Sequence, residues 1–160
     1  MMTGILLLSF LLTGCGSPEP QTGKKMSMYY INTAETNVEV HEQYLNTKTL
    51  DEQLDETMRY LSTTPEKLEY KAPLDMGFRV LDYEVEDGKL LINVDKAYSE
   101  LSPTTEVLVR AAIVRTLTQL PNVKYVGITV EDSQLYDNAG EMVGWMTADQ
   151  FINNDGNEIN

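Results

Sequence analysis

The sequence predicts a single α+β domain of two layers, in which two helices pack on one face of a small β-sheet. Two observations indicate this fold. Apolar residues recur at helical spacing in two separate segments. Short runs rich in β-branched and aromatic residues lie before, between and after those segments. The predicted order of elements is β-α-β-β-α-β, and a two-layer arrangement buries the apolar surfaces of both the sheet and the helices.

A strand over residues 26–32 and a helix that begins after Thr49 form the first part of the domain. The spacing of Thr49 and Glu52 matches a capping box, in which each side chain binds an otherwise unpaired backbone N–H. The Thr63-Thr64-Pro65 sequence ends the helix. The apolar stripe of this helix consists of Leu50, Leu54, Met58 and Leu61.

A β-hairpin is predicted over residues 79–94, because Asp87-Gly88 is a preferred two-residue turn. This turn sets the strand register, which places all the cross-strand apolar pairs on one face. The expected pairs are Val85 with Leu90, Tyr83 with Ile92 and Leu81 with Val94. The opposite face is expected to be wet and to carry Asp82, Glu84, Glu86, Lys89 and Asn93.

The second helix is expected to begin at Ser102-Pro103, an N-cap followed by a first-turn proline, and to run to about residue 120. A last strand follows over 123–130. The helix carries a bulky apolar stripe of Val109, Ile113, Leu117 and Leu120, which we expect to face the sheet. A slimmer stripe of Val107, Ala111 and Val114 should face the first helix. If the first helix lies elsewhere, this slim stripe is a candidate partner surface.

The N-terminus carries an apolar run, residues 5–12, that is shorter than the roughly 20 residues needed to span a bilayer. It ends in Leu12-Thr13-Gly14-Cys15, which resembles the lipobox of bacterial lipoproteins. The alternative is a frayed apolar N-terminus with a buried cysteine. We therefore expect a signal peptide over 1–14, a lipid-modified (palmitate-type) Cys15, a tether over 15–25, a domain over 26–152 and a flexible tail over 153–160. The expected location is the outer side of the cell membrane.

Composition excludes several classes of function. The chain has 25 Asp and Glu against 12 Lys and Arg, a net charge of -13, which argues against nucleic-acid binding because phosphates require basic partners. Cys15 is the one cysteine, so an intrachain disulfide or a thiolate metal cluster cannot form. We expect no cofactor and no bound metal.

Three stretches carry a resemblance to a known family: residues 80–94, the helix end over 113–123, and the strand over 126–130. Together they resemble a GerMN domain. The resemblance implies a bacterial lipoprotein outside the cytoplasm, associated with sporulation, germination and cell-envelope assembly, and similar in fold to modules that build ring-shaped envelope complexes. It implies no catalytic residues, and an envelope protein as the partner.

Two groups of titratable residues are candidates for other chemistry. His41, the one histidine, lacks a neighbouring nucleophile motif and is interpreted as an ordinary loop or strand-end residue. Acidic residues early in the first helix form either a weak Ca²⁺ site or a solvated face favoured by the helix dipole, and the second interpretation is preferred. These residues are Asp51, Glu52, Asp55 and Glu56.

The function favoured by the sequence is a non-enzymatic protein-binding or scaffolding module. The alternative is an enzyme acting on envelope glycan through Asp82, Glu84 and Glu86, since paired carboxylates hydrolyse glycosides when they face a cleft. A concave arrangement of these acids would favour the enzyme, and a flat sheet would disfavour it. Trp145, the single tryptophan, is either a partner anchor or a cover over the end of the core.

Overall fold

The computed structural model describes residues 23–65 and 69–151. The predicted signal peptide, Cys15 and the predicted tail over 153–160 lie outside the described residues. The first strand begins at Lys24, so the last two residues of the expected tether belong to the folded domain. Across the described ranges, no helix has the length and apolar character that crossing a bilayer requires.

The α+β class is confirmed, but the strands form two sheets instead of one. The first sheet has the order β2-β1-β3, made of β1 (Lys24–Asn32), β2 (Val38–Leu45) and β3 (Tyr70–Lys71). The second has the order β4-β5-β6-β7, made of β4 (Val80–Glu86), β5 (Lys89–Val94), β6 (Tyr125–Val130) and β7 (Ser133–Gln134). The helices are α1 (Leu50–Leu61) and α2 (Pro103–Leu117), with short 3-10 helices η1 (Lys96–Glu100) and η2 (Ala148–Phe151).

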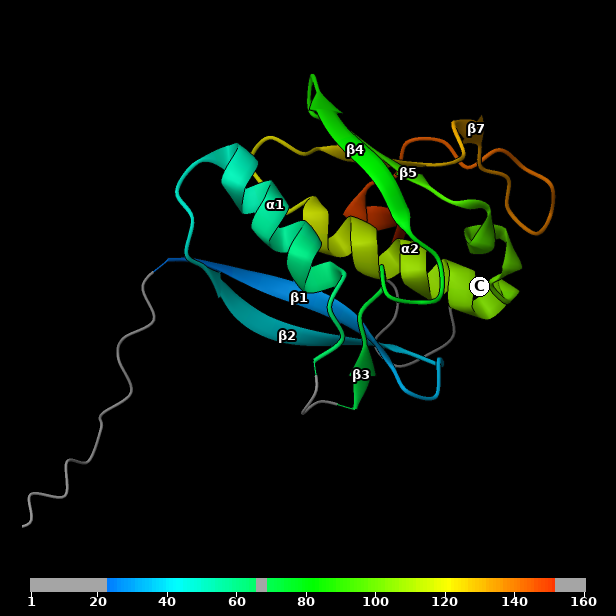
Figure 1. Cartoon of the computed structure of the whole chain (residues 1–160), viewed down its shortest axis with the longest axis horizontal. Coiled ribbons are helices and arrows are strands. Elements are labelled where there is room, and N and C mark those ends of the chain that lie inside the picture. The colour runs from blue at the N-terminus through cyan, green and yellow to red at the C-terminus, as the bar shows by residue number, and fades with distance from the viewer. Residues whose placement is uncertain (1–22, 66–68, 152–160) are drawn as a thin grey trace, which may run out of the picture.

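Helix α2 runs between the two sheets, with α1 beside it (Figure 1). This helix also makes the crossover between β5 and β6, which pair in parallel, while the other strand pairs are antiparallel. Buried side chains from both sheets and both helices form one continuous core. The predicted order therefore lacked β2, β3 and β7, and the expected single sheet was wrong.

The hairpin prediction is confirmed near the turn and wrong at its far end. Tyr83 pairs with Ile92, and Asp87 and Gly88 have φ of 49° and 79°, as a type I′ turn requires. A bulge between Val80 and Asp82 then shifts the register, so that Val80 pairs with Val94 and Leu81 is left 48% exposed. The acidic residues of β4 are exposed, as expected.

Helix α2 is buried on nearly all sides. Its start is confirmed, because the Ser102 hydroxyl accepts a hydrogen bond from the Thr105 N–H at 3.2 Å. The bulky stripe is buried, but so are Ala111 and Val114, which are 2% and 0% exposed. The two sheets cover the helix from both sides, so the slim stripe is not a surface for a partner, and of its members only Val107 is partly exposed.

Side chains of α2 also close an open edge of β1. The Gln119 side chain, just after the helix, accepts a hydrogen bond from the Ser27 N–H at 2.9 Å and donates to the Ser27 carbonyl at 2.7 Å. The Thr116 hydroxyl accepts from the Tyr29 N–H at 3.0 Å. These bonds replace the neighbouring strand that β1 lacks along this stretch, and they satisfy backbone groups that an edge strand otherwise leaves open.

Candidate functional site

The segment over residues 135–147 folds back along the edge of β6 and positions Trp145. Val126 and Met146 exchange two backbone hydrogen bonds, at 3.0 and 2.8 Å. The Val143 N–H donates to the Leu135 carbonyl at 2.9 Å. The segment is therefore paired with β6 next to Trp145 and cross-linked within itself, so that Trp145 lies on a supported backbone.

Trp145 packs over Gly127 on the outer face of the second sheet, away from the core. A Cβ atom at Gly127 would lie 2.8 Å from Cζ3 and 3.0 Å from Cε3 of the indole. The same position is 3.2 Å from Cδ1 of Leu91. Only glycine leaves room for this approach, and the indole remains 43% exposed. The Trp145 side chain therefore lies outside the core and does not cover the end of the core.

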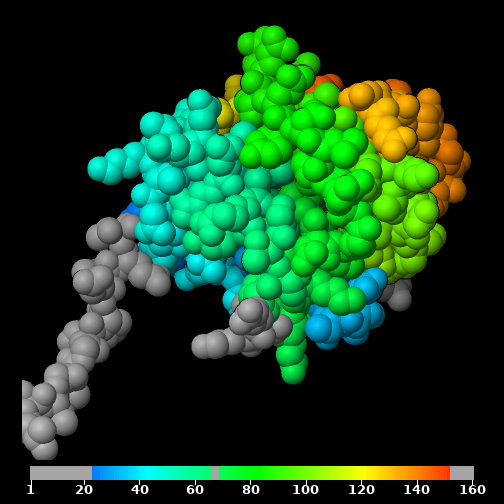
Figure 2. Space-filling model, in the orientation of Figure 1, coloured from blue at the N-terminus to red at the C-terminus, as the bar shows by residue number. Residues whose placement is uncertain are grey.

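The outer face around Trp145 combines apolar and charged groups. The strand pairing aligns two rows across this face, Glu84–Leu91–Gly127 and Glu86–Lys89–Tyr125. The Lys89 ammonium lies 5.4 Å from the centroid of the Trp145 ring, within the range of a cation–π interaction. The hairpin tip that carries Glu86 projects from the surface in Figure 2. An exposed aromatic group thus lies on the same face as two carboxylates.

Hydrogen bonds connect the polar side chains of a third row on this face. The Asn93 side-chain amide donates to Asp82 at 3.0 Å and to Asp132 at 2.8 Å. Its oxygen accepts from the Asp132 backbone N–H at 3.0 Å. Asp82 therefore has a structural partner, whereas Glu84 and Glu86 have no side-chain partner among the described residues.

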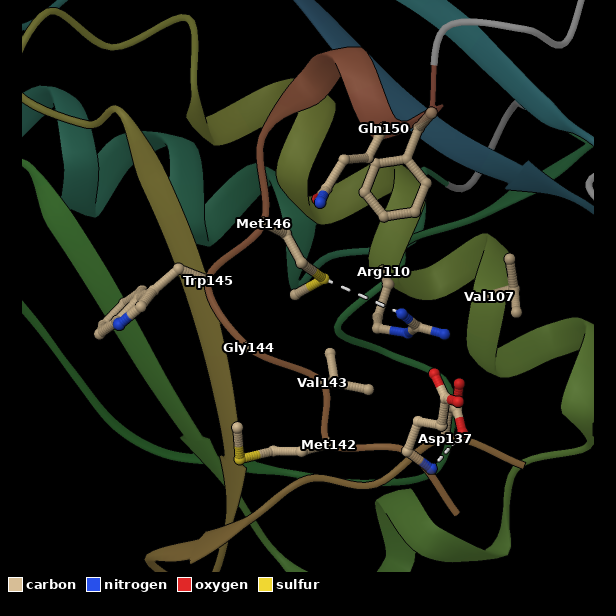
Figure 3. Close-up of a pocket in the computed structure, with 11 residues that line it drawn as sticks. Val107, Arg110, Asp137, Met142, Val143, Gly144, Trp145, Met146 and Gln150 are labelled. Carbon is tan, nitrogen blue, oxygen red and sulfur yellow. Dashed lines mark hydrogen bonds between the residues drawn. The ribbon is translucent and has the colours of Figure 1, made fainter. Parts of the chain in front are cut away.

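Two hollows lie on opposite sides of the segment that carries Trp145. Figure 3 shows Trp145 pointing to one side of the segment, and Val143 and Met146 to the other. The hollow on the Trp145 side has a volume of about 240 Å³. The hollow on the other side, between this segment, α2 and η2, has a volume of about 450 Å³.

The wall of the larger hollow contains a charged pair that is already neutralised. Arg110 donates to both carboxylate oxygens of Glu106, at 2.6 and 2.9 Å, and Nη1 lies 4.0 Å from the Met146 sulfur (Figure 3). The Tyr98 hydroxyl also donates to Glu106, at 3.0 Å. Burial, together with the Glu106 carboxylate, raises the pKa of Tyr98 well above its usual value. These groups stabilise the fold and leave no free base or nucleophile among them.

Three of the four acids of α1, Glu52, Asp55 and Glu56, have structural roles. Glu56 accepts hydrogen bonds from the Asn46 and Thr47 N–H groups and from the Thr47 hydroxyl, at 3.0, 3.2 and 2.8 Å. Glu52 completes the predicted capping box, and Asp55 accepts from the Tyr83 hydroxyl at 2.8 Å. A hollow of about 490 Å³ beside them is open to solvent. Among the residues with described positions, no three His, Cys, Asp or Glu side chains are grouped to hold a metal ion.

The two remaining candidates from the sequence, His41 and the acids of β4, do not form a catalytic centre. His41 lies within β2, not in a loop or at a strand end, and its ring is 5.9 Å from that of Tyr30 and 4.7 Å from that of Tyr70. The acids of β4 are exposed and line none of the three hollows described above. None of these hollows therefore supports the glycan-acting alternative.

The sequence analysis missed the residues that position Trp145. Gly127 interrupts a run of β-branched residues in β6, which is a known sign of close approach by another group. Leu91 falls within the predicted hairpin, whose alternation gives no sign of its closeness to Gly127. Arg110 and Glu106 lie four positions apart on α2, but their third partner, Tyr98, comes from η1.

Comparison with known proteins gives a clear relationship. No curated protein matches the chain by sequence. Among solved structures, the chain is similar to the first GerMN domain of the sporulation protein GerM from Bacillus subtilis, with 14% identity and a TM-score of 0.58 over 78% of this chain and 96% of that one. It is also similar to the tandem GerMN domains of the same Bacillus subtilis protein, with 18% identity and a TM-score of 0.55 over 84% of this chain and 49% of that one. A family model described as "Sporulation and spore germination" matches residues 27–136, more than half of the sequence, and the chain therefore belongs to this family, Germane.

Proposed function

We propose that this chain is a lipid-anchored protein on the outer side of the cell membrane, which presents one Germane domain as a non-enzymatic protein-binding module in sporulation or germination. Family membership supports the process. The apolar run that ends at Cys15 supports the anchor. The structure of the domain supports the binding role, as follows.

An exposed aromatic patch carries the proposal. We define this patch by Tyr136, Met142 and Trp145, which are 59%, 63% and 43% exposed. Tyr136 and Met142 lie opposite each other in an antiparallel bridge of the same segment that holds Trp145. Exposed apolar side chains gathered in one place favour an interaction site, and tryptophan is enriched at the centres of interfaces. Because Trp145 is already packed on Gly127, little conformational entropy remains to be lost on binding.

The anchor proposal fits the charge of the protein. With a net charge of -13, the protein is repelled by anionic lipid headgroups, so retention at the membrane depends on the lipid itself. A single acyl chain gives only marginal binding, whereas two or more give stable anchoring. We therefore expect Cys15 to carry the several acyl chains of a bacterial lipoprotein.

The anchor is tested by replacing its attachment point. Cys15→Ala should move the protein from the membrane pellet to the soluble fraction and abolish the acyl mass on the N-terminal peptide in mass spectrometry. Circular dichroism of the soluble product checks that the domain still folds. Retention of the variant at the membrane to the same extent as wild type would contradict the anchor.

The binding role is tested in a sporulating host that lacks the gene. The double variant Met142→Ala/Trp145→Ala should fail to restore spore formation or germination, although it remains folded and anchored. The matched control is Val40→Ala, an exposed apolar residue (55%) on β2 of the other sheet, which should restore both. Full restoration by the double variant would exclude the aromatic patch as the functional surface.

A further inference from the structure

We propose that the outer face of the second sheet binds a basic protein segment, which inserts one apolar side chain beside Trp145 and places Lys or Arg side chains against Glu84 and Glu86. This inference rests on the proposed function, and it adds the chemistry of the partner and the position of its contacts. The three residues come from β4 and from the segment along β6.

The geometry brings the apolar and acidic parts within reach of one short segment. Glu84, Leu91 and Gly127 are cross-strand neighbours, so Glu84 is two strands from the glycine that supports Trp145. Neighbouring strands lie about 4.8 Å apart, which puts β4 and β6 roughly 10 Å apart. A single extended or helical segment lying across the strands can therefore contact Trp145 and the β4 acids together.

The hollow beside Trp145 has the size and lining for one side chain. Its volume of about 240 Å³ is below the roughly 300–1,000 Å³ typical of small-molecule sites. Its apolar walls come from Leu91 and Trp145, and its floor is Gly127, with Thr129 among the polar residues. An aliphatic or aromatic side chain fills such a space and excludes water around the indole.

The charges on this face select a basic partner. No described Lys or Arg forms an ion pair with Glu84 or Glu86. Lys89 is the cross-strand partner of Glu86, but its ammonium lies over the Trp145 ring. The two carboxylates are thus available, and the net charge of -13 attracts a cationic partner from a distance. A neutral glycan would use the indole but would gain nothing from this pair of acids.

The direct test is a binding titration with the full-length chain in detergent. The probes are fluorescein-labelled Lys-Lys-Phe-Lys-Lys, the matched Glu-Glu-Phe-Glu-Glu, and an unlabelled tetramer of N-acetylglucosamine. Anisotropy reports binding of the labelled peptides, and the fluorescence of Trp145, the single tryptophan, reports all three. The basic peptide should bind saturably, at least about tenfold more tightly than the acidic one, and should weaken as salt is raised.

Variants separate a specific face from general charge attraction. Glu84→Lys/Glu86→Lys should weaken the basic peptide about tenfold. The control Glu39→Lys/Glu42→Lys makes the same charge change on β2 of the other sheet and should leave binding within about twofold. Trp145→Ala should also weaken it at least about tenfold by anisotropy, with circular dichroism as a check on folding.

Three results would overturn the inference. They are equal binding of the basic and acidic peptides, equal weakening by the β4 and β2 charge variants, and glycan binding that depends on Trp145 while the basic peptide does not bind. The host assay separates this failure from failure of the proposed function. If Glu84→Lys/Glu86→Lys restores sporulation and germination fully while Met142→Ala/Trp145→Ala does not, the module binds a partner but not through these acids.

Discussion

Thr116→Val tests whether α2 substitutes for a missing strand along β1. The Thr116 hydroxyl donates to the Ala112 carbonyl at 2.8 Å and accepts from the Tyr29 N–H at 3.0 Å. Valine has nearly the same shape but accepts no hydrogen bond, so the Tyr29 N–H loses its partner. An unsatisfied backbone group of this kind costs about 1–3 kcal/mol, and we expect a loss of about 2 kcal/mol in the free energy of unfolding.

Thr118→Val is the matched control. Its hydroxyl also donates to the carbonyl four residues earlier, Val114, at 2.7 Å, but no backbone N–H donates to it. That carbonyl already accepts from the Thr118 N–H at 3.1 Å, so the change should cost less than about 0.5 kcal/mol. Gln119→Leu removes both bonds to Ser27 and should cost about 3 kcal/mol.

Urea unfolding followed by Trp145 fluorescence measures these differences. The urea concentration at the midpoint should be nearly the same for wild type and Thr118→Val, lower for Thr116→Val and lowest for Gln119→Leu. The slope of the transition should not change. Of the two threonine variants, only Thr116→Val should accelerate hydrogen exchange at the Tyr29 amide. Equal losses from the two threonine variants would refute the edge-closing role of α2.

Three further changes test other contacts. Gly127→Ala should push the indole of Trp145 off the sheet, because a Cβ would lie 2.8 Å from Cζ3; the fluorescence emission should shift to longer wavelength. Burial acts to raise the pKa of Glu56, but hydrogen bonds from Thr47 and Asn46 outweigh this effect. The pKa of Glu56 therefore lies below its usual value of 4.5. Its stabilisation is present above the unfolded pKa and is lost as the pH falls through the lowered folded pKa, so Glu56→Gln should cost about 1–2 kcal/mol at pH 7 and progressively less as the pH is lowered in urea titrations. Tyr83→Phe should lower the free energy of unfolding by about 1 kcal/mol, because the hydrogen bond to Asp55 is lost. Burial and Asp55 raise the pKa of Tyr83 to about 12, so an NMR titration of the variant should lack a tyrosine with this pKa.

Local patterns in the sequence predicted the elements whose signals are local. The capping box at Thr49, the Asp87-Gly88 turn and the Ser102 cap are confirmed, because each depends on residues within a few positions of one another. The bulge at Leu81 was not predicted, because alternation from Leu81 to Glu86 favours Leu81 for the buried face, whereas the pairing with Val94 uses its apolar neighbour Val80.

The division into two sheets depends on long-range pairing and was not predicted. Strand β2 has no clear buried face, and Val40 is 55% exposed, so its hydrophobic pattern is weak. The site around Trp145 was missed for the same reason. The Gly127–Trp145 approach joins residues that the β7 turn and a long loop separate, and sequence periodicity carries no information about such pairs.

The closure of β1 by α2 also sets the order in which the domain can fold. Ser27 and Gln119 are 92 positions apart, so on a chain exported as we propose β1 emerges from the membrane well before its edge partner. During this time the β1–β2 hairpin has an open backbone edge that can pair with other chains. A chaperone on the outer side of the membrane should therefore be needed most for this N-terminal hairpin, and least once α2 has emerged.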